Sequence, residues 1–224
     1  MNTYHKIFGL YKRYREGEKK GKFIIGEYSR PEFELLKDIN WVWTEKIDGT
    51  NIRVCYYSNP LCQAVEFKGK TDKAEMPKHL LERLQELFPP EKLRALFPLS
   101  EEAPDVCLYG EGYGYKIQKG GKYFPDNPKQ VDFILFDIKI GNTWLKREDV
   151  EEIARQLNIR VVPIMGEGTI DKAIECMTGQ GFYSMFNDAY LAEGVVLRPK
   201  IELLDRRGHR IIVKLKHKDW EGYK

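Results

Sequence analysis

Apolar runs rich in β-branched and aromatic residues, broken by polar positions, recur along most of the chain. Such runs are typical of strands that bury one face. We therefore expect strands to dominate the fold. The predicted strands are residues 23–28, 41–47, 52–57, 64–68, 106–109, 133–140, 160–164, 194–198 and 210–215.

Three stretches carry apolar residues at helical spacing instead. Residues 77–88 begin with a proline, which suits the first helical position. The apolar stripe of this stretch consists of Leu80, Leu81, Leu84, Leu87 and Phe88. A second helix is expected at about residues 146–157, and a third starts near Thr169 as N-cap and ends before Gly179. Helices placed irregularly among strands predict an α+β fold with largely antiparallel sheets flanked by helices, because parallel strands would need a helix in nearly every connection.

Length and composition narrow the class of protein. The 224 residues are expected to form a single domain, and 42% hydrophobic with 32% charged residues exclude a disordered or fibrous chain. No apolar run approaches the roughly 18 residues of a membrane span, and the N-terminus has no export signal. The four cysteines, Cys55, Cys62, Cys107 and Cys176, form no CxxC pair, so neither a disulfide framework nor a zinc site is indicated, and a cytoplasmic location is expected.

The net charge is small. Thirty-seven Lys and Arg against 34 Asp and Glu leave +3, too little for the whole chain to act as a polycation toward nucleic acid. Phosphate-binding charge must therefore be local. One candidate is the segment of residues 115–129, which is rich in Gly, Pro and Lys and is predicted to be a long surface loop.

Lys46 lies in the sequence Thr-Glu-Lys-Ile-Asp-Gly-Thr-Asn, between two predicted strands. The Asp-Gly pair predicts a hairpin turn with Lys46 and Asp48 on one face and Glu45 on the other. A lysine attacks phosphorus only as the neutral amine, although its usual pKa is about 10.4, so a nucleophilic lysine needs burial or neighbouring cations. Taken alone, the motif is more typical of a solvated lysine beside a salt-bridging aspartate in a hairpin.

A second lysine pair lies near the end of the chain. Alternation along residues 210–215 and beyond places Lys214 and Lys216 on one strand face, with Val213 and Leu215 on the other. Two like charges so close are unfavourable unless an anion or water separates them, and a triphosphate is such an anion. An edge strand carrying lysines against aggregation is the alternative.

Two glutamates adjoin glycines at the ends of apolar strands. Glu111 lies in Gly-Glu-Gly, and Glu193 precedes Gly194. A glycine beside a carboxylate permits close approach of a ligand, and either glutamate suits ribose hydroxyls or the water shell of Mg²⁺. Each is also a common polar turn residue. Phe136, in an apolar strand, suits stacking on a purine or simple core packing.

Five segments, taken in the order in which they occur along the chain, resemble the motifs of the covalent nucleotidyltransferases. This superfamily comprises DNA ligases, RNA ligases and mRNA capping enzymes. The segments are residues 45–51, 110–112, 133–138, 193–196 and 214–216. The resemblance is closest to the RNA ligase 2-like group, because Asn51 stands where DNA ligases and capping enzymes typically carry Arg. It implies the ATP-grasp-like adenylation fold and RNA as substrate.

The resemblance also implies a role for each motif residue. Lys46 attacks the α-phosphorus of ATP and holds AMP, which passes to an RNA 5′-phosphate before an RNA 3′-OH displaces it. The implied nucleotide-binding residues are Glu45, Asp48, Asn51, Lys70, Glu111, Phe136, Glu193, Lys214 and Lys216. Among them, Asp48, Glu111 and Glu193 organise the water shell of Mg²⁺ or Mn²⁺. Lys70 stands where the family usually offers Arg to the phosphate.

Larger relatives continue into a C-terminal domain that engages nucleic acid, whereas this sequence stops soon after Lys216. We therefore expect either a minimal ligase or a catalytic fragment without that domain, and no obligate protein partner is implied. RNA would then bind to local basic clusters. The candidates are Lys116, Lys119 and Lys122 in the loop, and Arg206, Arg207 and Arg210. The alternatives are a DNA ligase, a GTP-using capping-type enzyme and a non-catalytic RNA-binding module.

Overall fold

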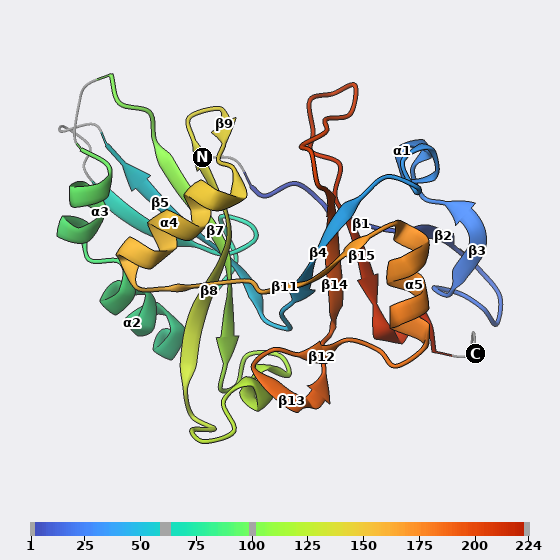
Figure 1. The fold of residues 1–224 in the computed structure, drawn as a ribbon. Helices are drawn as coiled ribbons and strands as arrows, with labels where there is room; N and C mark the ends of the chain where they lie inside the picture. Colours follow the sequence, from blue (N-terminus) through green and yellow to red (C-terminus); the bar gives the residue numbers. More distant parts are fainter. Residues whose placement is uncertain (1–2, 59–63, 99–101, 222–224) are drawn as a thin grey trace. The chain divides into compact units, whose positions relative to one another are not determined.

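The computed structural model describes residues 3–58, 64–98 and 102–221. Its chain forms two compact units (Figure 1). The central unit comprises residues 48–162 with Tyr4, and the terminal unit comprises residues 5–47 and 163–224. Cys62 lies outside the described residues, whereas Cys55, Cys107 and Cys176 are free thiols. None of the helices in the described part of the chain is long and apolar enough to cross a membrane.

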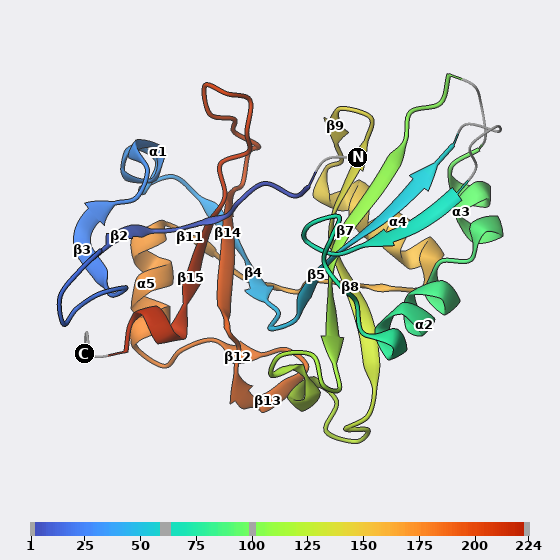
Figure 2. The same ribbon diagram turned by 180° about the vertical axis from the view of Figure 1, so that it is seen from behind.

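The central unit is a sheet with helices on one face (Figures 1 and 2). The strand order is β10-β8-β7-β5-β6, with β9 beside β8, and only β10 runs parallel to its neighbour among these described pairs. The strands are β5 (Thr50–Tyr57), β6 (Ala64–Lys68), β7 (Val106–Gly114), β8 (Val131–Ile140), β9 (Thr143–Trp144) and β10 (Arg160–Val161). The helices are α2 (Lys78–Leu87), α3 (Pro90–Leu96) and α4 (Arg147–Leu157), and a 3₁₀ helix, η1, spans Gly120–Tyr123.

The two faces of this sheet differ in what they carry. Ile52 and Val54 of β5 pack with Leu80 of α2 in the main core, between sheet and helices. The opposite face carries a smaller cluster in which Cys55, Cys107 and Tyr109 are buried. Alternation along a strand therefore directs every second side chain of β5 and β7 away from the helices.

The terminal unit is built on a second sheet, with strand order β1-β15-β14-β4-β11. Among the pairs described in this sheet, β1 with β15 is parallel and the others are antiparallel. Its strands are β1 (Phe8–Gly9), β4 (Trp41–Lys46), β11 (Ile164–Gly168), β14 (Gly194–Pro199) and β15 (Val213–Lys216). Two hairpins accompany it: β2 (Tyr11–Arg13) with β3 (Phe23–Tyr28), and β12 (Tyr183–Ser184) with β13 (Asn187–Leu191). The helices are α1 (Pro31–Leu35), α5 (Ile170–Thr178) and the 3₁₀ helix η2 (His217–Asp219).

Helix α5 covers one face of this sheet (Figures 1 and 2). Its apolar residues Ile170 and Ala173 are fully buried and belong to one core with Trp43, Val195 and Leu215 of the sheet. The helix begins as the sequence predicts, because the hydroxyl of Thr169 accepts a hydrogen bond from the N–H of Lys172 at 3.2 Å.

The α+β class with largely antiparallel sheets is confirmed, and so are the three predicted helices. The predicted strand at residues 160–164 is wrong, since the chain splits there into β10 and β11, which belong to different sheets. Pro163 lies between them and cannot donate a ladder hydrogen bond. The predicted strand at residues 210–215 begins only at Val213. Short helices α1 and α3 carried no clear periodic signal.

The predicted hairpin around Asp48 is also wrong. Strand β4 pairs with β14 and β11, whereas β5 pairs with β6 and β7. The residues between β4 and β5 therefore carry the chain from one sheet to the other, and strand alternation ends at Lys46. An Asp-Gly pair bends the chain in either case, so it does not specify which strands pair.

The predicted surface loop at residues 115–129 is only partly exposed. Ile117, Tyr123 and Phe124 are buried, and the ring of Phe124 stacks on Tyr113 with centroids 5.1 Å apart. The segment contains η1 but, among its described residues, no α-helix or strand. Its aromatic residues anchor it to the central unit.

Candidate active site

Lys46 is the last residue of β4, which lies beside β14, and β14 in turn lies beside β15. In the register of the sheet, Gly194 of β14 lies opposite Lys46 on one side and opposite Lys216 of β15 on the other. Glu193 precedes Gly194, and its carboxylate joins the two lysines. Lys46 Nζ donates to Glu193 Oε2 at 2.5 Å, and Lys216 Nζ donates to Glu193 Oε1. The sheet thus brings together three predicted site residues.

Gly194 permits this arrangement because β14 and β15 approach closely there. A Cβ atom at this position would lie 1.9 Å from the carbonyl oxygen of Leu215 and 2.7 Å from Cα of Lys216. A side chain here would push the strands apart and with them Glu193 and Lys216. The glycine beside the carboxylate therefore serves close packing of backbone.

The Lys46–Glu193–Lys216 cluster is largely shielded from solvent. The side chains of Lys46, Glu193 and Lys216 are 21%, 17% and 18% exposed. Burial alone would raise the pKa of the Glu193 carboxyl, but Lys46 and Lys216 outweigh it and hold that pKa below its ordinary value. Two ammonium groups against one carboxylate leave one net positive charge. This surplus suits an anionic ligand.

The alternation predicted for β15 is confirmed. Val213 and Leu215 are fully buried, whereas Lys214 and Lys216 are half-buried on the other face. Lys214 and Lys216 line a cavity of about 400 Å³, together with Lys6, Arg13 and Lys218. The anion at Lys216 in this structure is the Glu193 carboxylate. The cavity gathers several cations in the terminal unit.

Glu45 points to the opposite side of β4 from Lys46. Its side chain is buried, and Oε2 accepts a hydrogen bond from the N–H of Met185 at 3.0 Å. Met185 lies in the turn between β12 and β13, so Glu45 fixes that turn against the main sheet. Its contact with adenine stays a prediction.

His217 is a neighbour of this cluster that the sequence did not single out. Its Nδ1 lies 2.8 Å from the carbonyl oxygen of Ala192, and its Nε2 accepts from the N–H of Phe182 at 3.1 Å. The backbone N–H of His217 donates to the backbone carbonyl of Glu193. Burial lowers the pKa of the imidazole, which favours the neutral form that this pair of bonds requires. The only sequence signal is adjacency to Lys216.

In the central unit, Asn51 of β5 and Glu111 of β7 lie directly opposite each other in the ladder. The Glu111 side chain passes over Gly49, where a Cβ would lie 2.8 Å from Glu111 Cγ and 2.4 Å from the carbonyl oxygen of Gly112. Asp48 next to Gly49 donates its backbone N–H to the hydroxyl of Tyr123 at 2.8 Å. Three predicted site residues therefore converge within this unit.

The Asn51 side chain presents an unused acceptor. Its buried Oδ1 has no hydrogen-bond partner among the residues that the structure describes. A buried carbonyl oxygen without a partner costs free energy of about 1–3 kcal/mol. The position therefore suits a ligand that donates a hydrogen bond.

Arg53 is a buried charge that the sequence analysis missed. Its side chain is 0% exposed, and it donates to the carbonyl of Gly69 at 3.0 Å and to Asp72 Oδ1 at 2.6 Å. These bonds fix the loop that carries the predicted site residue Lys70, whose side chain is exposed. The signal was a charged residue inside the apolar strand β5, two positions after Asn51.

Phe136 belongs to the cluster on the helix-free face of the sheet. It is half-buried and meets the ring of Tyr4 edge-on, with centroids 5.1 Å apart. Asn51 shares a face of β5 with Cys55, and Cys55 lies in the same cluster. Asn51 and Phe136 thus point from one face of one sheet. Stacking of Phe136 on adenine stays a prediction.

Direct metal ligation finds no support among the described residues, because no group of three or more His, Cys, Asp or Glu side chains there could hold an ion. Asp48 and Glu111 still fit a cation that keeps its water shell, since Glu111 overlies Gly49, the neighbour of Asp48. Binding through water by Asp48, Glu111 and Glu193 stays a prediction.

Comparison with known proteins agrees with these motifs. A family model described as RNA ligase matches residues 39–216. No curated protein sequence matches the chain. Among solved structures, a variant of the RNA ligase of Naegleria gruberi with ATP and Mn superposes with a TM-score of 0.62 and 20% identity over 84% of this chain. Another variant, with AMP and Mn, superposes with a TM-score of 0.62 and 19% identity over 87% of this chain. The enzyme with PPi superposes with a TM-score of 0.62 and 20% identity over 85% of this chain. The match spans 54%, 54% and 53% of those chains, so this chain covers about half their length.

Proposed function

Because this chain belongs to the RNA ligase family, we propose that it is an ATP-dependent RNA ligase that forms a covalent lysyl-AMP at Lys46. The observation that carries the proposal is the Lys46–Glu193–Lys216 cluster. A lysine at a strand end, hydrogen-bonded to a carboxylate with a second lysine behind it, combines a nucleophile, a proton acceptor and a counter-charge.

In the first step, Lys46 Nζ attacks the α-phosphorus of ATP, and the bond from that phosphorus to the bridging oxygen of pyrophosphate breaks. Lys46 must lose a proton to attack, and Glu193 Oε2 at 2.5 Å is the acceptor in reach. Lys216 leaves Glu193 for the phosphates, and with Lys214 it offsets their charge as pyrophosphate leaves. Lys70 contributes a further cation to the phosphates.

The central-unit residues hold the nucleoside in this proposal. Glu111 accepts from a ribose hydroxyl, and Asn51, with its unused Oδ1, binds beside it. Phe136 stacks on the adenine ring. Glu45, a residue of the terminal unit, contacts the edge of that ring. Arg53 is a positioning residue, since it holds the Gly69–Asp72 loop and with it Lys70.

A divalent cation, Mg²⁺ or Mn²⁺, supplies charge neutralisation to the triphosphate when it is bound. Asp48, Glu111 and Glu193 are the carboxylates that would hold its water shell. The Naegleria gruberi enzyme variants were solved with Mn together with ATP or AMP. The donor set here, carboxylates without His or Cys, fits a hard cation of this kind.

In the later steps, a 5′-phosphate oxygen of RNA attacks the phosphorus of the lysyl-AMP, which releases Lys46 and leaves AMP on the RNA end. The 3′-OH of a second end then attacks the RNA 5′-phosphorus and expels AMP. We propose that both units serve this one reaction as a single nucleotidyltransferase domain, because its motif residues are divided between them. The free thiols Cys55 and Cys107 suit a reducing, cytoplasmic setting.

Incubation with α-labelled ATP and Mg²⁺ tests the proposal. Label should remain on the denatured protein, survive in Lys20→Ala, and vanish in Lys46→Ala. Labelling by GTP alone would instead indicate a capping-type enzyme. Sealing of nicked DNA but not of RNA ends would indicate a DNA ligase. Salt-dependent RNA binding without any label would leave only the non-catalytic module.

A further inference from the structure

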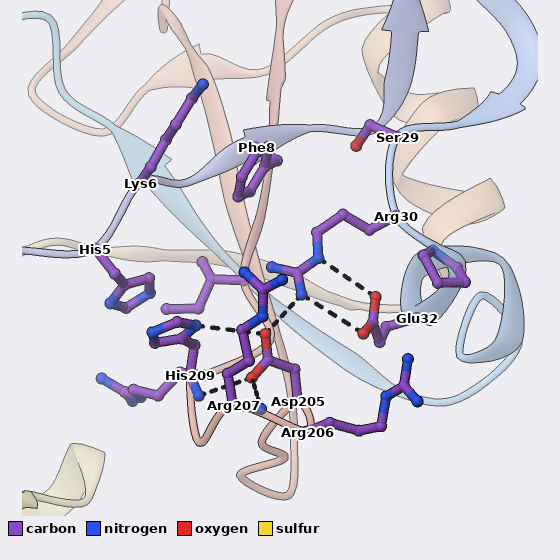
Figure 3. A pocket seen from close by; sticks show the side chains of 13 residues that line it. His5, Lys6, Phe8, Ser29, Arg30, Glu32, Asp205, Arg206, Arg207 and His209 are labelled. Atoms are coloured by element: carbon purple, nitrogen blue, oxygen red, sulfur yellow. Dashed lines mark hydrogen bonds and ion pairs between the residues drawn. The ribbon is translucent and has the colours of Figure 1, made fainter.

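A second charged cavity of the terminal unit is lined by none of the residues proposed for adenylation. It measures about 650 Å³ and is lined by three segments, residues 5–8, 29–32 and 205–212. Figure 3 shows Phe8, Arg30 and Asp205 from these three segments around it. Neither Lys46 nor Glu193 lines it.

The cavity concentrates positive charge. Lys6, Arg30, Arg206, Arg207 and Arg210 line it against only Glu32 and Asp205, a surplus of three. The whole chain also carries +3, so the remaining residues balance to about zero. The local density of cations therefore far exceeds the average of the surface, as expected of a phosphate-binding site.

The carboxylates of the cavity are engaged in holding its walls. Asp205 Oδ2 accepts from Arg30 at 2.6 Å, and Oδ1 accepts the backbone N–H groups of Arg207 at 2.8 Å and His209 at 2.9 Å. Arg30 and these N–H groups hold the pKa of Asp205 far below its usual range. Asp205 thus organises the turn that carries the arginines, as the dashed lines in Figure 3 show.

Arg206 and Arg207 are the charges that this scaffold leaves available. Both side chains are exposed, and no described residue forms an ion pair with either. In contrast, Arg210 is buried and paired with both oxygens of Glu202. Two adjacent arginines held on a fixed turn suit bidentate contact with phosphate oxygens.

An aromatic ring completes the cavity. Lys6 Nζ lies 5.1 Å and the guanidinium carbon of Arg30 lies 5.3 Å from the centroid of Phe8. Half-buried, Phe8 combines a stacking surface with flanking cations, which is the combination that binds single-stranded nucleic acid. In Figure 3 the Lys6 side chain extends away from Asp205, on the other side of the Phe8 strand.

This cavity adjoins the one lined by Lys214 and Lys216. Both are lined by Lys6, Phe8 and Ser29, so the strand that carries Phe8 forms their common wall. A strand that occupies the basic cavity therefore lies beside Lys214 and Lys216, and Lys216 shares the Glu193 carboxylate with Lys46. Residues far apart in sequence thus place two basic cavities next to each other within one unit.

We propose that the cavity of Arg206, Arg207 and Phe8 binds the phosphodiester backbone of a single-stranded segment of the RNA substrate. The proposal rests on the proposed ligase function, and it assigns RNA binding to the terminal unit itself. Recognition is through phosphates and stacking, so it is independent of sequence and weakens as salt rises.

The test uses the full chain with Arg206 and Arg207 both changed to Ala. Binding of a fluorescent 12-nucleotide RNA is measured by anisotropy at several salt concentrations. Affinity should fall by about 10-fold near 0.1 M salt, and the slope of log K against log salt should flatten by about one to two units. Phe8→Leu should weaken binding with an unchanged salt slope, because it removes stacking and no charge.

The matched control is Lys19→Ala with Lys20→Ala, two exposed cations on the β2–β3 turn of the same unit. This control should bind RNA as the unchanged protein does. Unaltered RNA affinity in the Arg206 and Arg207 variant would overturn the inference. So would a loss confined to RNA with a 5′-phosphate and absent with a 5′-OH, because the backbone is common to both. Self-adenylation needs no RNA, so its absence in the unchanged protein would overturn the proposed function instead.

Discussion

Glu193 and Asp205 are two shielded carboxylates of the terminal unit, each paired with cations, yet their surroundings differ. The Glu193 carboxylate is held by two lysine side chains, Lys46 and Lys216. Asp205 is held by one arginine and by two backbone N–H groups of its own turn. In both cases these partners outweigh burial, which alone would raise a carboxyl pKa, and the pKa is lowered.

The difference indicates which carboxylate can change partners. Flexible lysine side chains can leave Glu193 for a phosphate and return at small conformational cost. The N–H groups of Arg207 and His209 cannot leave Asp205 unless the turn unfolds. The Glu193 cluster is therefore suited to chemistry and the Asp205 turn to presenting fixed charge.

The largest effect is expected from Glu193→Gln. The amide keeps the shape but cannot accept a proton from Lys46, so the rate of self-adenylation should fall by about 100-fold. Rapid-quench labelling with α-labelled ATP measures it. Glu167→Gln removes an exposed carboxylate of the same unit, paired with Lys200, and serves as the control. A change of less than twofold in the Glu193 variant would show that another group takes the proton.

Two glycine substitutions, one beside Glu193 and one in the Asp205 turn, should lower the free energy of unfolding by different amounts. Gly194→Ala introduces a Cβ that clashes with backbone of Leu215, so the free energy of unfolding should fall by about 3 kcal/mol. Gly208→Ala in the Asp205 turn meets no atom within 4 Å but has φ of +75°, so it should cost about 1 kcal/mol. Urea titrations of both variants measure these values. Equal losses would contradict the close approach at Gly194.

Asp205→Asn should weaken RNA binding without changing the adenylation chemistry. It removes the charge that holds Arg30 and loosens the turn that carries Arg206 and Arg207. We expect a loss of RNA affinity smaller than the 10-fold of the double arginine variant, measured by the same anisotropy titration. The loss of one negative charge could instead raise RNA affinity. Such a rise would show that Asp205 is not needed to hold the turn that carries Arg206 and Arg207.

The smallest effect is a pH dependence near neutrality. Burial lowers the pKa of His217, so below about 6.5 the unfolded state takes up a proton that the folded state refuses. Stability should therefore fall as pH decreases from 6.5 toward the lowered folded pKa. The slope should stay below the limit of about 1.4 kcal/mol per pH unit for one proton, since the ring is only half-buried. His217→Gln should abolish the slope in melting temperature between pH 7 and 5.5.

Glu193 and Asp205 contribute in a more acidic range. Their lowered pKa values stabilise the fold above about pH 4, the range of unfolded carboxyl groups, and this contribution is lost as pH falls through the folded values. The His217→Gln variant is therefore still expected to lose stability as pH falls below about 4. Its absence would mean that neither ion-paired carboxylate stabilises the fold.

Local patterns predicted much of the secondary structure and the chemistry of single strands. The β15 alternation and the Thr169 cap depend on neighbours in sequence, and both were correct. Helices α1 and α3 were missed because five and seven residues are too few for a periodic signal. Arg53 was overlooked because its partners, Gly69 and Asp72, lie in another segment.

The sequence by itself determined the α+β class, the three longer helices, and the ordered motifs around Lys46, Glu111, Glu193 and Lys216, because each depends on residue type and spacing alone. Only the tertiary structure decided that β4 and β5 join different sheets, that Glu193 bridges two lysines, and that three segments form the Phe8 cavity. The reason is physical. A turn sequence fixes how the chain bends, but which strands pair depends on burying the apolar faces of whole sheets, and that involves residues far apart in the chain.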